Sequence, residues 1–262
     1  MKLPARNTLP LTKAREVIKE LRIEEPDEIE IELIAAHKNA PVQEKDLNGA
    51  DGRMVRLGEK SVITVRKSIR YAGQRRFVVA HELGHVLLHP HVRQIDEVKL
   101  EQLSNWSLKQ DPEEIEANLF AAEILMPESL FVPRIANVEP GFKSLRELAI
   151  EFRTSLTATA IQFLRYTKEE CVLVSSRNGH RKWFWTSNGF SFRLRSEMGI
   201  HSYTCADELR REGGQALRAE DVPAGCWLSG FSPSGEECVT EDAIFSSKFG
   251  ETLSLIWIKD AI

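Results

Sequence analysis

The chain has 262 residues, of which 42% are hydrophobic and 28% charged, and its formal net charge is −4 at pH 7. This length suits one large domain or two modest ones, and the composition is that of an ordinary globular protein. The small acidic balance excludes non-specific binding to nucleic acid or to acidic membranes as the main task. We see neither an apolar run long enough to span a membrane nor a secretory signal, and we expect a cytoplasmic protein.

The first 66 residues predict two helices followed by a hairpin. Residues 11–21 carry apolar side chains at helical spacing, with Thr12 as the candidate N-cap. Pro26 opens a second helix, whose buried side chains we expect to be Ile29, Leu33, Ile34 and Ala36. Residues 54–57 and 62–65 predict two strands joined at Gly58.

The next helix carries the chemistry. Residues 77–89 have the sequence FVVAHELGHVLLH, in which His81 and His85 lie four residues apart and share one helix face. Two such histidines can present their ring nitrogens to one metal ion, and Glu82 beside them can reach a water molecule there. The alternative is a buried amphipathic helix whose histidines bond within the core. Gly84 costs up to about 1 kcal/mol in a helix, so we expect either a packed helix or a substrate close to it.

A catalytic zinc site needs three protein ligands, so a third must be found. His89 lies one turn beyond His85, but three ligands on one straight helix rarely converge on one ion. The better source is residues 111–127, where Asp111 and Pro112 predict the start of a helix.

This second helix, which Pro127 ends, is predicted to bury one face formed by Ile115, Leu119, Ala122 and Met126. Glu114 can reach the metal, and Asn118, one turn later, can hydrogen-bond a ligand histidine. We expect Glu113 and Glu116 to face solvent. The polar segment 90–110, which links the two helices, predicts no regular element.

The two segments together resemble a known family. RFVVAHELGHVLLH at residues 76–89, followed by EIEANLFAAEILMP at 114–127, looks like the ImmA/IrrE metallopeptidases. The resemblance spans roughly the first two-thirds of the chain. It implies a zincin-like fold and makes Glu114, four residues before Asn118, the third ligand. It also implies that the substrate is a helix-turn-helix transcriptional repressor, whose cleavage releases stress-response or mobile-element genes.

The predicted site follows from these residues. His81, His85 and Glu114 are the expected ligands of zinc, although affinity order alone does not exclude manganese, iron or cobalt. Glu82 is the expected catalytic acid and base. His89 is a candidate for contact with the substrate or the transition state, with a structural role as the alternative.

In the zincin architecture an edge strand binds extended substrate. We assign that role to residues 61–66, with an interior strand that makes no substrate contact as the alternative.

Residues 145–166 predict two short helices that meet at 153–155, with Ser155 as the N-cap of the second. This pair is similar to a helix-turn-helix. A DNA-reading helix usually begins with exposed Arg, Asn or Gln, whereas this one begins SLTATA. We therefore favour packing onto the metallopeptidase domain over contact with DNA.

From Cys171 onward the chain predicts a small antiparallel sheet. Residues 172–174 and 182–185 flank the turn signal Asn178-Gly179 and form a hairpin. Further strands are expected at 190–194, 225–228, 237–239 and 252–258, and a helix at 205–211. No chemistry is visible here. The four cysteines, Cys171, Cys205, Cys226 and Cys238, lack CxxC spacing, so we expect reduced structural thiols.

The sequence thus predicts an α+β protein in three parts. They are a zincin-like metallopeptidase domain (1–139), a helix-turn-helix-like helical segment (140–168), and a small β-rich α+β domain of sensor or regulatory type (169–262). In some family members a GAF-like sensor domain lies at this end. The predicted function is site-specific, metal-dependent cleavage of a protein substrate, without direct DNA binding or a membrane partner. The alternatives are a regulatory protein that binds DNA or a regulator through the helical pair, and a metal hydrolase of another substrate class.

Overall fold

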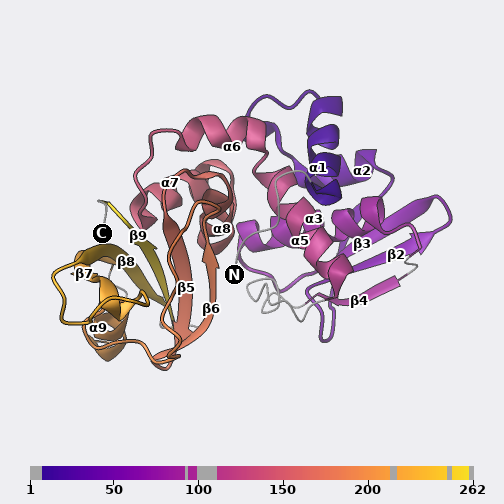
Figure 1. Ribbon diagram of the computed structural model, residues 1–262. Helices are drawn as coiled ribbons and strands as arrows, with labels where there is room; N and C mark the ends of the chain where they lie inside the picture. Colours follow the sequence, from indigo (N-terminus) through magenta and orange to yellow (C-terminus); the bar gives the residue numbers. More distant parts are fainter. Residues whose placement is uncertain (1–7, 92–93, 99–110, 213–216, 247–249, 260–262) are drawn as a thin grey trace. The chain divides into compact units, whose positions relative to one another are not determined.

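The computed structural model describes residues 8–91, 94–98, 111–212, 217–246 and 250–259. It is an α+β protein in which the described residues form two sheets and two compact units (Figure 1). Among the described residues, the first unit consists of residues 8–134 and 147–162, and the second consists of residues 135–146 and those from 163 onward. The three-part division predicted from the sequence stays a prediction.

The first unit contains a four-stranded sheet with strand order β1-β3-β2-β4. Its strands are β1 (Val42–Lys45), β2 (Gly52–Leu57), β3 (Lys60–Arg66) and β4 (Gln94–Val98). The predicted hairpin is confirmed, because β2 and β3 pair antiparallel on either side of Gly58, whose φ is +65°. No regular element was predicted at β4.

The edge-strand prediction for residues 61–66 is wrong. Strand β3 pairs with β1 on one side and with β2 on the other, so its backbone groups are already used within the sheet. The edges among the described strands are β1 and β4. Hydrophobic pattern cannot separate an edge from an interior strand, because strand order depends on pairing with distant segments.

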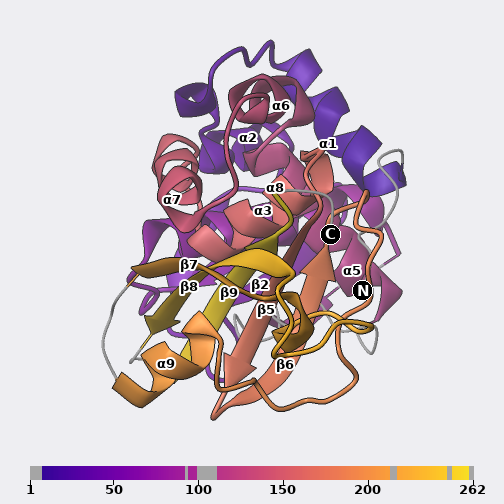
Figure 2. The same ribbon diagram turned by 60° about the vertical axis from the view of Figure 1, so that its left-hand side comes forward.

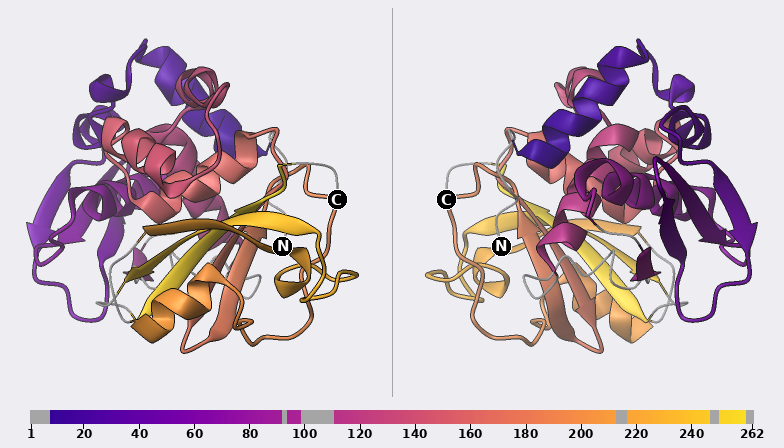
Figure 3. Two further views of the ribbon diagram at one scale, coloured as in Figure 1. Left: turned by 90° about the vertical axis from the view of Figure 1, so that its left-hand side faces the viewer. Right: turned by 90° about the vertical axis from the view of Figure 1, so that its right-hand side faces the viewer.

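Helices α3 (Ala72–Leu88) and α5 (Pro112–Leu125) lie on one side of this sheet (Figure 3). Helix α3 packs against β2, β3 and α5. A Cβ atom at Gly84 would lie 3.1 Å from the Cα atom of Ala117. The missing side chain of this glycine therefore lets α5 pack closely against α3. Helix α5 is buried on all sides from Ala117 to Leu125, where the sequence predicted one buried face.

Two predictions for the N-terminal helices are wrong. Helix α1 (Leu9–Glu20) begins after Thr8, so Thr12 lies inside it; the first turn accepts Pro10 because its N–H groups need no helical partner. The second predicted helix is a 3₁₀ turn (Pro26–Glu28) followed by α2 (Ile31–His37). Since α2 begins at Ile31, its buried positions are Ile31, Ile34 and Ala35, and both Leu33 and Ala36 are exposed.

The remaining helices in this part of the chain are α6 (Glu128–Ile135), α7 (Phe142–Glu151) and α8 (Leu156–Tyr166). The predicted break between α7 and α8 is confirmed: Arg153 has a φ of 54°, and Ser155 Oγ accepts a hydrogen bond from the Ala158 N–H at 3.2 Å. The helix-turn-helix character of the pair stays a prediction.

The second unit contains a five-stranded antiparallel sheet in the order β6-β5-β9-β8-β7. Helix α9 (Cys205–Glu212) packs on β7, β8 and β9 (Figure 2). The strands are β5 (Cys171–Arg177), β6 (His180–Thr186), β7 (Leu217–Pro223), β8 (Cys238–Ser246) and β9 (Glu251–Trp257).

The hairpin β5–β6 is confirmed, because Asn178 and Gly179 both have positive φ, as its tight turn requires. Two of the predicted strands are wrong. Residues 190–194 make only an isolated bridge to Leu228, and residues 224–226 form a 3₁₀ turn, because both segments lie outside the sheet that covers α9. Strand β7 was not predicted.

None of the described helices has the length and apolar character that crossing a membrane requires.

Candidate metal centre

Three ligand atoms converge between α3 and α5. The Nε2 atoms of His81 and His85 lie 2.9 Å apart. The carboxylate of Glu114 approaches both rings, with Oε2 at 3.3 Å from His81 and Oε1 at 3.3 Å from His85. Among the described residues this is the single group of three or more His, Cys, Asp or Glu side chains close enough to hold an ion.

The spacing of these atoms suits one small cation. Zinc bonds of about 2.0–2.1 Å in tetrahedral geometry place ligand atoms about 3.3 Å apart. The distances of 2.9 and 3.3 Å in this cluster are close to that value. Two nitrogens and one carboxylate are also a donor set that zinc accepts, so the residues fit a metal of this kind.

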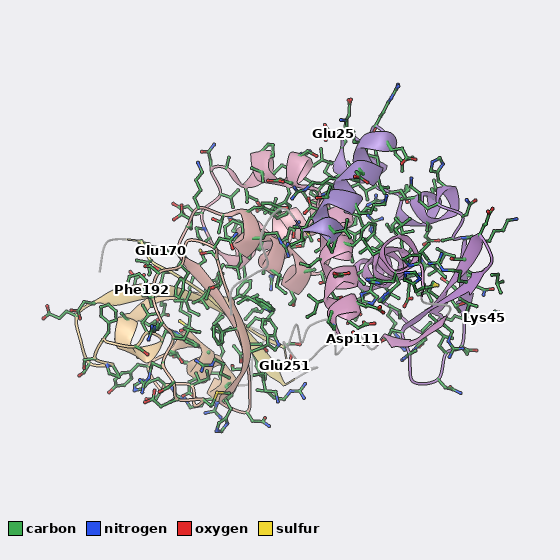
Figure 4. The ribbon with its side chains drawn as sticks, turned by 45° about the vertical axis from the view of Figure 1, so that its right-hand side comes forward. Glu25, Lys45, Asp111, Glu170, Phe192 and Glu251 are labelled. Atoms are coloured by element: carbon green, nitrogen blue, oxygen red, sulfur yellow. The ribbon has the colours of Figure 1, made fainter. Side chains whose placement is uncertain are left out.

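The protonation states suit a cation as well. Burial lowers the pKa of His85 to about 4, so its ring is neutral at pH 7. Burial of Glu114 opposes its ionisation, but its contacts with His81 and His85 outweigh this effect and lower its pKa. Glu114 also lies in the first turn of α5, the helix that begins after Asp111, which is labelled in Figure 4. The helix dipole favours a negative charge there.

A second layer of contacts holds the two histidines. His81 Nδ1 lies 2.9 Å from Oδ1 of Asn118, as predicted from the sequence. His85 Nδ1 lies 2.9 Å from Nδ1 of His89, and His89 Nε2 lies 3.0 Å from Oε2 of Glu116. Glu116, expected to face solvent, is therefore engaged, although its side chain is 42% exposed. Protein groups contact both ring nitrogens of His89, and its role as a substrate contact stays a prediction.

Glu82 lies beside this cluster and is fully buried. Neither carboxylate oxygen has a hydrogen-bond partner among the described residues. Burial, with a smaller contribution from the negative charge of Glu114, raises the pKa of Glu82 well above its ordinary value. An unsatisfied buried carboxyl group costs several kcal/mol unless a cation or a water molecule joins it.

Gly52 makes room for this carboxylate and was not identified from the sequence as part of the site. A Cβ atom there would lie 2.6 Å from Glu82 Oε1 and 2.5 Å from Val78 Cγ1. The pairing of β2 with β4 shifts register between Gly52 and Arg53. The one available signal, a glycine at the start of a strand, also fits an ordinary turn.

Further contacts hold both helices in place. Arg56 of β2 donates to the Val86 carbonyl at 3.0 Å, near the C-terminal end of α3. Buried Glu123 of α5 accepts from Arg15 Nε at 2.7 Å, from the Glu128 N–H at 3.1 Å and from Gln162 Nε2 at 3.2 Å. These contacts join α5 to α1, α6 and α8.

Two histidines and a carboxylate lie on facing helices, beside a glutamate that has no hydrogen-bond partner among the described residues. This arrangement defines a candidate hydrolytic metal centre. The model of the Peptidase_M78 family, described as the IrrE N-terminal-like domain, matches residues 35–177. The match covers more than half of the chain and includes every residue of the cluster. The chain therefore belongs to this family of metallopeptidases, as the resemblance in its sequence implied.

A solved structure described as a Mycobacterium tuberculosis transcriptional regulator is also similar. The likeness has a TM-score of 0.60 at 14% sequence identity and covers 95% of this chain and 76% of that one. At this identity the likeness shows the fold alone. No curated protein matches the chain.

Proposed function

We propose that this protein is a metal-dependent endopeptidase that hydrolyses one peptide bond at a defined site in a protein substrate. The observation that carries the proposal is the position of Glu82. Its carboxylate is buried without a hydrogen-bond partner among the described residues, directly beside three converging ligand atoms. A protein that only binds a partner has no use for such a costly group in that place.

In the proposed mechanism His81, His85 and Glu114 hold the ion, for which zinc is the first choice and manganese the second. When bound, such an ion polarises a carbonyl group and lowers the pKa of water. Glu82 takes the proton of the attacking water and delivers it to the leaving amine. Asn118 accepts the Nδ1 proton of His81 and so leaves Nε2 of that ring available as a ligand.

Family membership supports the choice of substrate. We propose a helix-turn-helix transcriptional repressor in the cytoplasm, whose cleavage derepresses stress-response or mobile-element genes. In this proposal the helical pair α7–α8 packs within the protein and does not read DNA.

The test is a cleavage assay on a helix-turn-helix repressor encoded beside this gene. The repressor is incubated with the protein and zinc or manganese, and the products are identified by mass spectrometry. We expect one metal-dependent cut. It should be lost with a chelator and reduced about 10²–10⁴-fold in Glu82→Gln, which removes the acid and base. Glu113→Gln, a change of an exposed glutamate on α5, is the matched control.

Full cleavage by Glu82→Gln would overturn the mechanism. Hydrolysis of small amides or esters, with proteins left intact, would favour a hydrolase of another class. An intact repressor together with no bound metal would favour the regulatory binding protein.

A further inference from the structure

The two histidines of the candidate centre are supported in different ways. His81 contacts an amide oxygen, that of Asn118. His85 contacts another imidazole, that of His89, which in turn contacts the carboxylate of Glu116. His89 is buried, with 7% of its surface exposed, and it follows α3 as its C-cap residue.

The proton positions along this chain of contacts follow from the ring nitrogen that faces the other ligands. His85 turns Nε2 toward His81 and Glu114. A neutral imidazole that offers the lone pair of Nε2 carries its proton on Nδ1. The Nδ1–H of His85 must then donate to Nδ1 of His89, at 2.9 Å.

Because His89 accepts at Nδ1, its ring carries the proton on Nε2. This N–H donates to Oε2 of Glu116 at 3.0 Å. In this row of hydrogen bonds, from His85 through His89 to Glu116, every donor therefore meets an acceptor. Donation in this direction leaves Nε2 of His85 available as a ligand. The carboxylate at the far end is an acceptor only, so it favours a proton on Nε2 of His89.

From this geometry we propose that His89 and Glu116 are positioning residues, which together fix the tautomer and the orientation of His85 for metal binding. The proposal rests on the proposed function and deepens it. A histidine that merely fills the core would need no carboxylate partner, and Glu116 would then be an ordinary glutamate near the surface.

The test measures zinc affinity in the full chain by competition with a chromophoric chelator. We expect His89→Leu and Glu116→Ala each to weaken zinc binding about 10- to 100-fold, as loss of outer contacts to a ligand histidine does. His89→Gln, whose amide oxygen can accept from His85, should recover part of the loss. Glu113→Ala, on the same helix and exposed, should bind zinc as the wild type does.

Because Glu116 acts through His89, the double variant His89→Leu/Glu116→Ala should bind zinc no more weakly than His89→Leu alone. Nitrogen-15 NMR of labelled histidine provides an independent readout. It should show the His85 proton on Nδ1 in the wild type and a mixture of tautomers in Glu116→Ala.

Wild-type affinity in Glu116→Ala, or losses that simply add in the double variant, would overturn the proposal. Glu116 is close to the surface, so its substitution tests the idea even if His89→Leu does not fold. These outcomes differ from a failure of the proposed function, in which the wild type itself would bind no metal or cleave no protein.

Discussion

Each of the two units contains a fully buried glutamate whose pKa is raised by burial, and the two differ in their partners. Glu241 of β8, in the second unit, receives four hydrogen bonds. The donors are the N–H groups of Cys205 at 2.9 Å and Ala206 at 3.1 Å, Trp227 Nε1 at 3.0 Å and Ser254 Oγ at 2.8 Å. Glu82 of α3, in the first unit, receives none from the described residues.

Under the proposed function, the difference separates a structural carboxylate, Glu241, from a catalytic one, Glu82. Glu241 joins the first turn of α9 to β8, β9 and the segment that carries Trp227, and its charge suits the N-terminus of a helix. The carboxylate of Glu82 joins no described segment through a hydrogen bond, and its burial is as complete as that of Glu241. In the proposed function, a cation held by the neighbouring ligands and a water molecule compensate this burial.

The largest effect on stability should come from Glu241→Leu. Four buried donors would lose their acceptor, and we expect the free energy of unfolding to fall by about 3–5 kcal/mol. Urea unfolding followed by circular dichroism measures this change. Glu82→Leu leaves no described donor unpaired, so the free energy of unfolding should fall far less in this variant. Equal losses of stability in the two variants would contradict the distinction between Glu241 and Glu82. Glu236→Leu, at an exposed site, serves as the control.

Glu114→Ala should remove the metal while the protein stays folded. The variant loses the one carboxylate among the three converging ligand atoms, so we expect affinity to fall by more than about 100-fold. Metal content after dialysis against a weak chelator measures the loss, with Glu113→Ala as the matched control. A full complement of metal in Glu114→Ala would show that another residue provides the third ligand.

Gly52→Ala should disturb Glu82 more than it disturbs the metal ligands. The added methyl group meets Oε1 of Glu82 at 2.6 Å and Val78 at 2.5 Å, which we expect to cost about 1–3 kcal/mol. Cleavage should therefore fall much further than zinc affinity. Gly199→Ala, whose Cβ atom has no neighbour within 4 Å, should change neither quantity. Undiminished cleavage in Gly52→Ala would show that the Glu82 carboxylate adapts without loss.

The smallest effect concerns Glu82→Gln in the metal-free protein. The pKa of Glu82 is higher in the folded protein than its ordinary value of 4.5. The contribution of Glu82 to the free energy of unfolding is therefore complete below pH 4.5 and is lost as the pH rises through the folded pKa. Glutamine resembles the protonated form at every pH. The variant should therefore be more stable than the wild type at pH 7, by about 1 kcal/mol.

The gap in stability should close as the pH falls toward 4. Thermal unfolding with a chelator present, repeated from pH 4 to pH 8, measures it. A gap that is independent of pH would show that burial does not perturb Glu82.

The sequence by itself determined the features that depend on neighbouring residues. The period of a helix places His81 and His85 on one face, so their shared orientation follows from spacing alone. Turn residues set the hairpins β2–β3 and β5–β6 for the same reason, since positive φ at Gly58 or at Asn178-Gly179 is a local requirement. The separation of α7 from α8 at Arg153 is equally local.

Only the tertiary structure decided which residues of distant elements contact one another. It placed β3 inside its sheet, Gly52 against Glu82, and Glu116 on His89. It also supplied four donors to Glu241, from segments far apart in the chain. Each of these contacts depends on how distant elements pair and pack. The local sequence does not distinguish Glu113, which is exposed, from Glu116, which contacts His89. The physical reason is that the spacing of residues along a helix or strand fixes the direction of their side chains, whereas the packing of one element on another decides which residues those side chains contact.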